Sequence, residues 1–385
     1  MEFMAERVSG FGTTIFTEMT ALAREHGAIN LGQGSPDFAA PNFVKQAGVD
    51  AILADVNQYA PGSGQLSLRR ALAEKMQRQY GLTFDPLSEI NVTVGATQAI
   101  FATVLGVVNP GDEVIVFEPY YDSYVPSIQI AGAIPRFYTL RQPDWVIDPD
   151  ELAALFNDRT RLIIVNTPHN PTGKVFSQEE LQLIADLCHK YDVLALTDEV
   201  YEHIVFDGRI HHTLASFPGM AGRTITVSSL GKTFSVTGWK VGWTMARPEL
   251  TQAIFRAFQF ATFCGAAPLQ EGAATAVATD DSYYTGLSQL YQDKRDLLMA
   301  GLRAAGLTPI QPAGTYFVLV DISPLGFEND VAFCRTLTTE IGVAAIPPSA
   351  FYHNPADGAS LARFAFCKTD EMLVEAAERL QKLRG

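Results

Sequence analysis

Through the middle of the chain, short apolar runs alternate with longer stretches whose apolar residues recur at helical spacing. The short runs are rich in β-branched residues and predict strands over 89–94, 113–117, 161–166, 193–197, 224–227 and 243–246. The longer stretches predict helices over 66–80, 95–107, 121–131 and 177–190. Ser177 begins the last helix and Glu180 follows three residues later, a pair that predicts a capping box. Short buried strands that alternate with helices indicate a mostly parallel sheet covered on both faces.

The two ends of the chain predict a second, smaller unit. A helix is expected over 15–25, and a long helical region over 268–305 leads away from the sheet. Beyond it we expect strands over 315–320, 343–346 and 363–366, with helices over 330–341 and 370–383. This part of the chain is therefore predicted to form a smaller α/β domain that packs on the first.

The composition limits the classes of partner. The 385 residues are 47% hydrophobic, and 28 basic residues against 42 acidic ones give a formal net charge of −14. Such a surface repels nucleic acids and anionic membranes, so we predict that neither is a partner. The cysteines are far apart and form no Cys-x-x-Cys pair, which favours reduced thiols in a cytoplasmic protein; they are Cys188, Cys264, Cys334 and Cys367. The sequence contains neither an apolar run of about 18 residues nor the apolar core of a signal peptide.

The most distinctive chemistry lies in the loop of residues 227–243. Lys232 stands there among small and hydroxylic residues, and Lys240 follows eight positions later. Such a lysine can clamp an anion or act as an amine nucleophile, and the second role requires surroundings that lower its pKa. A phosphate loop of the NTPase type is excluded, because that motif needs a glycine where Thr226 stands. For this loop taken alone, an ordinary surface lysine is the other alternative.

Polar residues gather where the predicted strands end. Asn166 to Gly173 follows one strand, Asp198 to Tyr201 ends the next, and Gly95 to Thr97 lies at the start of a helix. Ligands of parallel sheets bind beyond the carboxyl ends of the strands, and a helix start offers free amides to a phosphate. Asp198 can hold a cation, and Lys232 can hold a carbonyl carbon as an imine. One ligand uses all of these groups at once, pyridoxal 5′-phosphate.

Three motifs carry a family resemblance. The chain contains Asn-x-Pro-x-Asn-Pro-x-Gly from Asn166, Asp-Glu-x-Tyr from Asp198, and Ser-x-x-Gly-Lys-x-Phe-x-x-x-Gly-x-Lys-x-Gly from Ser228. In their order and spacing the sequence resembles a class I aminotransferase of pyridoxal-phosphate fold type I, over almost its whole length. Within the family it is most similar to bacterial methionine aminotransferases and kynurenine/glutamine transaminases. The segments that carry this narrower resemblance are 12–17, 31–34, 57–60, 121–124, 314–317 and 342–347.

The resemblance implies an α/β fold in which a large domain has a mostly parallel seven-stranded sheet between helices. The expected parts are an N-terminal segment (1–45) that joins the small domain, the large cofactor-binding domain (46–280), a linking long helix (281–306) and a small C-terminal α/β domain (307–385). It also implies a homodimer with shared active sites, because Tyr59 resembles a tyrosine that reaches the phosphate bound by the neighbouring subunit.

Roles in cofactor binding follow from the same resemblance. Lys232 would form the internal aldimine and later shuttle a proton, and Asp198 would pair with the protonated pyridine nitrogen. Tyr201 and Asn170 would bond the phenolic oxygen, and Tyr121 would stack on the ring. For the two tyrosines, core packing is the alternative role. The residues expected at the phosphate are Ala96, Thr97, Ser229 and Lys240. Many relatives have arginine in place of Lys240, so the clamp should be looser here.

The substrate side of the resemblance centres on Arg363, which lies inside an apolar strand and would bind the α-carboxylate together with the Gly34 amide and Asn170. The alternative for Arg363 is a structural salt bridge. The candidate residues around the substrate side chain are Ile15, Phe16, Tyr121, Phe260 and Tyr316. No second arginine has a motif-based place in the pocket, so an acidic side chain would be buried without a partner.

The predicted function is therefore transfer of the α-amino group of a neutral amino acid to a 2-oxo acid. Methionine and aromatic amino acids are the expected donors, with glutamine or kynurenine as further candidates. On this basis, Phe16→Ala is expected to weaken methionine and phenylalanine while affecting alanine little. Two alternatives are a carbon–sulfur β-lyase on the same fold and a non-catalytic pyridoxal-phosphate sensor. The sensor is disfavoured because the chain has no basic N-terminal extension that could read DNA.

Overall fold

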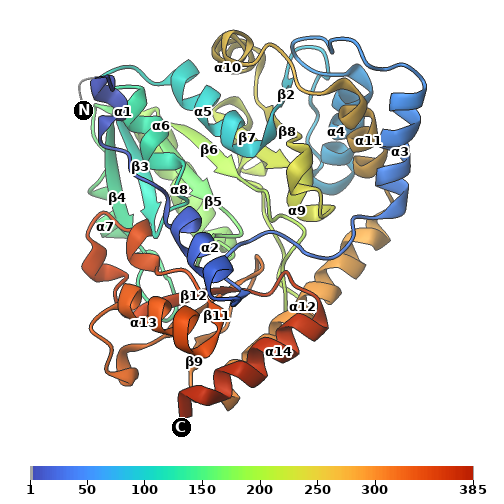
Figure 1. Ribbon diagram of the computed structural model, residues 1–385. Helices are drawn as coiled ribbons and strands as arrows, with labels where there is room; N and C mark the ends of the chain where they lie inside the picture. Colours follow the sequence, from blue (N-terminus) through green and yellow to red (C-terminus); the bar gives the residue numbers. More distant parts are fainter. Residues whose placement is uncertain (1–2, 385) are drawn as a thin grey trace.

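A mostly parallel sheet forms the centre of the computed structural model, which describes residues 3–384 (Figure 1). Within those residues the sheet has seven strands in the order β2-β8-β7-β6-β5-β3-β4. They are β2 (Ile90–Thr93), β3 (Glu113–Glu118), β4 (Ile134–Thr139), β5 (Thr160–Asn166), β6 (Leu194–Asp198), β7 (Thr224–Ser229) and β8 (Gly242–Met245). Strand β8 runs antiparallel to β2 and β7, and the other neighbours are parallel. The predicted α/β fold with a mostly parallel sheet is confirmed.

Both faces of this sheet are covered, as its apolar strands require. Successive side chains of a strand point to opposite faces. In β5, Ile163 and Val165 accordingly join one core cluster, whereas Leu162 and Ile164 join another. Helix α8 (Gln178–Tyr191) covers the first face, and α5 (Gly95–Val107) and α10 (Pro248–Ala261) cover the second. The predicted capping box of Ser177 and Glu180 is confirmed at the start of α8.

A third layer of helices lies beside the β2–β8 edge. Helix α11 (Ala267–Val277) contacts both α3 (Asn42–Leu53) and α4 (Leu66–Tyr80). Their apolar side chains join those of β2 and β8 and of the segment after Lys232 in one core cluster. The short helix α9 (Leu230–Thr233), which carries Lys232, is therefore supported by this layer as well as by the sheet.

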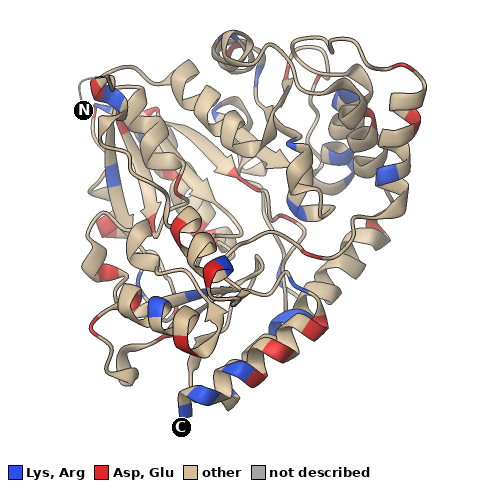
Figure 2. Ribbon diagram, viewed as in Figure 1, with Lys and Arg blue, Asp and Glu red and all other residues tan. Residues whose placement is uncertain are grey.

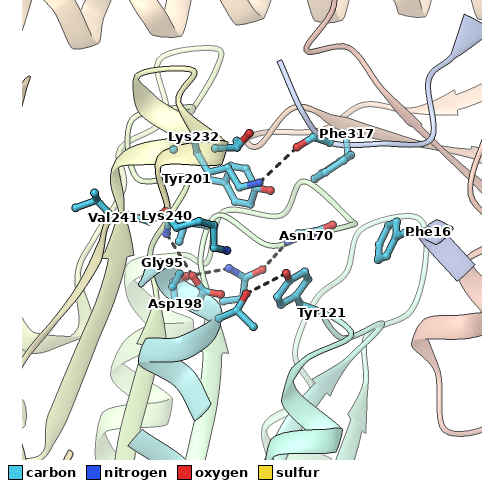
Figure 3. A pocket seen from close by; sticks show the side chains of 18 of the residues that line it. Phe16, Gly95, Tyr121, Asn170, Asp198, Tyr201, Lys232, Lys240, Val241 and Phe317 are labelled. Atoms are coloured by element: carbon cyan, nitrogen blue, oxygen red, sulfur yellow. Dashed lines mark hydrogen bonds between the residues drawn. The ribbon is translucent and has the colours of Figure 1, made fainter. Parts of the chain in front are cut away.

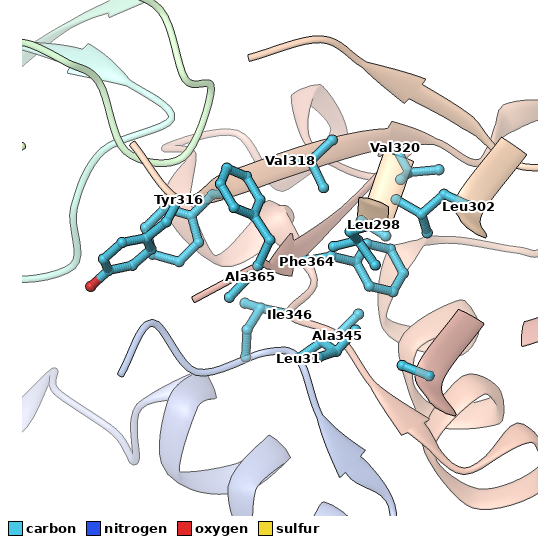
Figure 4. Close-up of a cluster of buried hydrophobic side chains, with 14 of the residues drawn as sticks. Leu31, Leu298, Leu302, Tyr316, Val318, Val320, Ala345, Ile346, Phe364 and Ala365 are labelled. Carbon is cyan, nitrogen blue, oxygen red and sulfur yellow. The ribbon is translucent and has the colours of Figure 1, made fainter. Parts of the chain in front are cut away.

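The C-terminal part and the N-terminal segment share a separate core (Figure 4). Strands β9 (Thr308–Ile310), β10 (Phe317–Asp321) and β12 (Leu361–Ala365) form an antiparallel sheet, and β1 (Ile29–Asn30) pairs in parallel with β11 (Val343–Ala344). Helices α12 (Asp281–Ala304), α13 (Asp330–Thr336) and α14 (Asp370–Leu380) pack around these strands. Although α2 (Ile15–Glu25) comes from the other end of the sequence, it lies beside them in Figure 1.

Several predicted elements differ from the observed ones. The region 268–305, predicted to be helical, consists of two helices, α11 and α12; α12 begins at Asp281, the first residue of the expected linking helix (281–306), and the side chain of Asp280 accepts a hydrogen bond from Ser282 N at this start. The helix predicted over 121–131 begins only at Tyr124, as α6 (Tyr124–Ile130), and the strand predicted from residue 315 begins at Phe317. Strand β4 and helices α3 and α10 were not predicted. Met1, Glu2 and Gly385 of the predicted terminal parts lie outside the described residues.

The surface of the small-domain helices carries both signs of charge. Figure 2 shows acidic and basic residues interspersed along α14, where Arg379 and Glu375 form an ion pair one turn apart. Across residues 3–384, every helix is too short or too polar to cross a membrane. The same stretch holds no cluster of histidine, cysteine and acidic side chains suited to a metal ion.

Candidate active site

One cleft opens at the carboxyl ends of β5, β6 and β7, beside the start of α5 (Figure 3). It contains about 980 Å³ of space between the atoms, which includes open solvent at its mouth. Of the residues predicted for the site, twelve line this cleft: Phe16, Gly34, Ala96, Thr97, Tyr121, Asn170, Asp198, Tyr201, Ser229, Lys232, Lys240 and Arg363. The fold thus brings together residues that are up to about 350 positions apart in the sequence.

Lys232 enters the cleft from α9, directly after β7. Its Nζ donates a hydrogen bond to the carbonyl oxygen of Gly34 at 3.4 Å, and it lies 5.8 Å from the ring centroid of Tyr201 and 5.5 Å from that of Tyr316. Burial lowers the pKa of the Lys232 amine to about 8. At pH 7 roughly a tenth of this amine is then neutral, whereas an exposed lysine is almost wholly protonated. Lys232 therefore meets the requirement for an amine nucleophile.

Asp198 is the last residue of β6 and is 4% exposed. Its Oδ2 accepts a hydrogen bond from the hydroxyl of Tyr124 at 2.7 Å. Burial raises the pKa of Asp198 to about 6, although the hydrogen bond from Tyr124 opposes this shift. A buried carboxylate with a neutral donor and an open cleft beside it is suited to a ligand that brings a positive charge.

The start of α5 forms an anion site with Lys240. Gly95 begins the helix at φ +80°. Gly242 lies so close to Gly95 that a Cβ added to Gly242 would be 2.5 Å from the carbonyl carbon of Gly95. A Cβ on Gly95 itself would lie 3.1 Å from Lys240 Nζ, so the ammonium group stands at the helix N-terminus. Free amides and a lysine at one helix start favour a phosphate.

Arg363 lies on β12 and is 1% exposed. Its Nη1 donates to Asn170 Oδ1 at 3.2 Å and its Nη2 to the carbonyl oxygen of Gly32 at 2.7 Å. Within residues 3–384, its buried Nε has no hydrogen-bond partner. These partners are neutral oxygens, so the alternative of a structural salt bridge has no support in the contacts. Burial lowers the pKa of Arg363 to about 10, which leaves the guanidinium charged at neutral pH.

Aromatic rings surround the Arg363 guanidinium. Its Cζ lies 4.2 Å from the ring centroid of Phe317, 5.0 Å from that of Phe16 and 5.5 Å from that of Phe351. The rings of Phe16 and Phe351 also stack on each other, with centroids 5.6 Å apart. The guanidinium is therefore held in one place by cation–π contacts, and its unpaired Nε leaves donor capacity for a carboxylate.

Between the anion site at the start of α5 and the Arg363 guanidinium, further polar groups line the cleft. They belong to Tyr121, Tyr201 and Asn170. Burial raises the pKa of Tyr121 to about 12 and that of Tyr201 well above its usual value, so both phenols stay protonated at neutral pH. The Tyr121 hydroxyl is 3.3 Å from Thr97 Oγ1, at the start of α5. The main-chain amide of Asn170 donates to Asn166 Oδ1 at 2.7 Å, which fixes the loop after β5.

Four predicted residues do not line the cleft. Phe260 is 89% exposed, because α10 buries the face of Ile254 and Phe258 and Phe260 points elsewhere. Ile15 packs instead against the core of the small domain. Tyr316 is buried behind the wall, where its hydroxyl donates to the carbonyl oxygen of Gly34 at 2.7 Å. Tyr59 is 84% exposed and packs against Phe263. Ile15, Phe260 and Tyr316 are therefore wrong as parts of the wall in this subunit.

Some cleft residues were missed by the sequence reasoning. They are Asn166, Val200, Gly231, Thr237, Val241 and Phe317. Most stand next to a motif residue, so the motif spacing could have indicated them. Phe317 could not be assigned in this way, because whether Tyr316 or Phe317 faces the cleft depends on where β10 begins.

Comparisons with known proteins agree with this geometry. Residues 26–380 match the family "Aminotransferase class I and II". The chain is 46% identical to a probable N-succinyldiaminopimelate aminotransferase of Mycobacterium tuberculosis, over 98% of each chain. It is 41% identical to a kynurenine–oxoglutarate transaminase of Dictyostelium discoideum, over 99% and 96%. The solved structure of an Escherichia coli methionine aminotransferase superposes with a TM-score of 0.95 at 41% identity, covering 99% of both chains. The chain therefore belongs to the class I and II aminotransferases and is a pyridoxal-phosphate-dependent transaminase.

Proposed function

We propose that this transaminase takes the α-amino group from neutral amino acids, above all methionine and aromatic amino acids, and transfers it to a 2-oxo acid. Glutamine and kynurenine are further candidate donors. The observation that carries the proposal is the charge pattern of the cleft. Among the described residues that line it, the cations are Lys232, Lys240 and Arg363, and the rings beside Arg363 are apolar. An anionic side chain would lose its water there without gaining a partner.

The cleft fits the cofactor that this family implies, pyridoxal 5′-phosphate. When bound, it supplies an aldehyde carbon and an electron-withdrawing ring. Lys232 has the lowered pKa that bonding to that carbon requires, and within residues 3–384 the Asp198 carboxylate forms hydrogen bonds but no ion pair. We assign the ring nitrogen to Asp198, the ring face to Tyr121 and the phenolic oxygen to Tyr201 and Asn170. The residues assigned to the phosphate are Ala96, Thr97, Ser229 and Lys240.

The substrate is oriented by the other end of the cleft in this proposal. Arg363 binds the α-carboxylate, assisted by Asn170 and the amide of Gly34. The neutral fraction of the Lys232 amine can then take a proton from the substrate Cα. Phe16 and Phe317 exclude water and contact the side chain, and a long neutral side chain gains about 0.8 kcal/mol per buried methylene.

A second candidate donor is N-succinyldiaminopimelate. The 46% identity to a probable N-succinyldiaminopimelate aminotransferase favours it. The distal part of that donor bears carboxylates, which would need cations beyond Arg363. Of the side chains lining the described cleft, Lys232 and Lys240 are already assigned, so we rank this donor second.

Donor and acceptor assays test the proposal. Each of methionine, phenylalanine, kynurenine, glutamine and aspartate is supplied with a 2-oxo acid, and kcat/KM is measured. Methionine and phenylalanine should exceed aspartate, and an aspartate value equal to that of methionine would refute the neutral pocket. Pyruvate and ammonia from a cysteine conjugate without an acceptor would indicate the β-lyase alternative.

The homodimer with shared sites and the cytoplasmic location stay predictions. The non-catalytic sensor is not adopted, because the three relatives named above are all enzymes by name.

A further inference from the structure

A second set of polar side chains is buried beside the cleft. Asp198 and Tyr201 line the cleft from the turn after β6, but Glu199 and Glu202 of the same turn do not. Glu199 is 1% exposed and Glu202 is 6% exposed. An ionised carboxylate is costly to bury unless it is paired and hydrogen-bonded. The function proposed above uses neither glutamate directly, so their burial requires another explanation.

Glu202 connects α4 to two segments that carry cofactor residues, the turn after β6 and the end of β7. Its Oε1 accepts a hydrogen bond from Lys75 Nζ at 2.5 Å, and its Oε2 accepts one from the hydroxyl of Tyr80 at 2.8 Å. Both donors belong to α4. The hydroxyl of Ser228, at the end of β7, donates to Oε1 at 3.3 Å. One carboxylate therefore joins α4, the turn after β6 and the end of β7.

The groups that face Glu202 keep its carboxylate ionised. Burial disfavours its charge, but Lys75 and then His203 and His211 outweigh this and lower the pKa of Glu202 to about 2. Burial lowers the pKa of His203 to about 3, and its ring is stacked on Tyr284 with centroids 3.8 Å apart. Burial raises the pKa of Tyr80 far above its usual value. Glu202 is therefore ionised at neutral pH, beside the Lys75 amine and the protonated hydroxyl of Tyr80.

The second glutamate fixes the other end of the same turn. Glu199 Oε1 accepts from Thr213 Oγ1 at 2.9 Å, and its Oε2 lies 3.0 Å from His211 Nε2. The amide of Glu199 donates to the carbonyl oxygen of Val227 at 2.8 Å, which ties the turn to β7. Tyr201 lies between Glu199 and Glu202 in the chain, so these two glutamates hold the backbone on both sides of it, while its ring packs edge-on against Tyr316 and Phe317.

We propose that Glu202, paired with Lys75, is a positioning residue for the cofactor pocket. It fixes Tyr201, the next residue in the chain, relative to the end of β7, where Ser229 and Lys232 follow Ser228. The inference rests on the proposed function, in which Tyr201 bonds the phenolic oxygen of the cofactor. Its physical basis is that a hydrogen-bond donor acts only within a narrow range of distance and angle, so the residues that hold it decide its strength.

Four variants and a matched control test this inference. Glu202→Gln removes the anion, Lys75→Met removes the cation, and the double variant removes both. Tyr80→Phe removes one hydrogen bond and is the mildest change. The control is Glu113→Gln, which removes a buried carboxylate that forms ion pairs with the exposed Arg159 and the partly exposed Arg136 at the amino end of β3, away from the cleft. Each protein is prepared without cofactor, and its melting temperature, its dissociation constant for pyridoxal 5′-phosphate and the pH midpoint of the bound cofactor's visible absorption are measured.

The expected results separate positioning from mere stability. At metal sites the loss of a supporting contact of this kind costs about 10–100-fold, and we expect Glu202→Gln and Lys75→Met to weaken cofactor binding by about tenfold. We also expect both to shift the pH midpoint, with Tyr80→Phe shifting it less in the same direction. The double variant should recover part of the loss, because it leaves no unpaired charge. Glu113→Gln should lower only the melting temperature.

The opposite results would overturn the inference. If Glu202→Gln and Tyr80→Phe lower the melting temperature but leave both the dissociation constant and the pH midpoint at the wild-type values, Glu202 is only structural. If Glu202→Gln does not fold, Tyr80→Phe decides alone by the same two readouts. A wild-type protein that neither binds the cofactor nor transaminates would instead contradict the proposed function, so the two failures are distinct.

Discussion

Replacement of Phe16 by alanine tests how the cleft holds both ends of a donor. The Phe16 ring lines the cleft, stacks on Phe351 and lies 5.0 Å from Arg363 Cζ. The sequence alone predicts a loss confined to long apolar donors. The contact with Arg363 adds a loss for every donor, because the α-carboxylate proposed to bind there is common to all amino acids.

The two parts of this loss have different sizes. A cation–π contact contributes about 0.5–2 kcal/mol, and the low end applies because Phe317 lies nearer to the guanidinium than Phe16 does. Alanine should therefore lose about 0.5–1 kcal/mol of transition-state binding, which is about two- to fivefold in kcat/KM. Methionine and phenylalanine also lose about two methylene-sized contacts, at about 0.8 kcal/mol each. Their total is about 2–3 kcal/mol, or about 30- to 150-fold.

The assay compares kcat/KM for alanine, methionine and phenylalanine in the wild type, in Phe16→Ala and in Ile15→Ala. Ile15 is the matched control, since it lies beside Phe16 on α2 and, like Phe16, packs against the core of the small domain, but does not line the cleft. Ile15→Ala should lower the melting temperature and leave the ratio of methionine to alanine unchanged. An equal loss for alanine and methionine in Phe16→Ala would refute the side-chain contact, and no loss for either donor would refute both parts.

Three further predictions concern the cofactor end of the cleft. Lys232→Ala should still bind pyridoxal 5′-phosphate but lose transamination. Borohydride should no longer attach the cofactor to this variant, which mass spectrometry would show. Wild-type activity in the variant would refute the assignment of Lys232. Burial raises the pKa of Asp198 from 3.8 to about 6. Between pH 4 and pH 6, Asp198 is therefore still protonated in the folded cofactor-free protein but ionised in the unfolded chain. The folded protein consequently loses up to about 3 kcal/mol of stability as the pH rises from 4 to 6. Asp198→Asn should therefore raise the melting temperature of the cofactor-free protein at pH 7.5 but not at pH 4, and an equal effect at both pH values would contradict the shift. Mixing Tyr59→Phe subunits with Lys232→Ala subunits should restore part of the activity if the sites are shared between subunits, and no recovery is expected if Tyr59 acts within its own subunit.

Much of the fold could be predicted because its strands are short, apolar and buried on both faces. The observed β5 and β6 lie within one residue of their predicted bounds. Strand β4 was missed because it lies at the edge of the sheet and includes Pro135 and Arg136. Helix α12 begins at Asp281, the first residue expected of the linking helix (281–306), and the side chain of Asp280 caps this start. Helix α10 did carry a signal, since Leu250, Ile254 and Phe258 recur every four residues.

Those cleft residues that belong to motifs at strand ends could be predicted from the sequence. The partners that hold those residues could not, because they come from distant parts of the chain. Tyr124 bonds Asp198 across 74 positions, and Lys75 bonds Glu202 across 127. The error of Tyr316 for Phe317 has a local cause, since Thr315 takes a φ of +66° and only then does β10 begin. Side-chain facing at such a point depends on backbone geometry rather than on residue type.

The central claim is that one arginine and an aromatic wall select neutral donors. The most direct measurement is the ratio of kcat/KM for methionine to that for N-succinyldiaminopimelate, with the same 2-oxo acid as acceptor and the cofactor-loaded wild-type protein. Arg363 serves the α-carboxylate in both donors, so the ratio reports only how the cleft treats the rest of the molecule. The account predicts a ratio well above one, because the distal carboxylates of N-succinyldiaminopimelate meet no unassigned cation among the described cleft residues. A ratio well below one would contradict it.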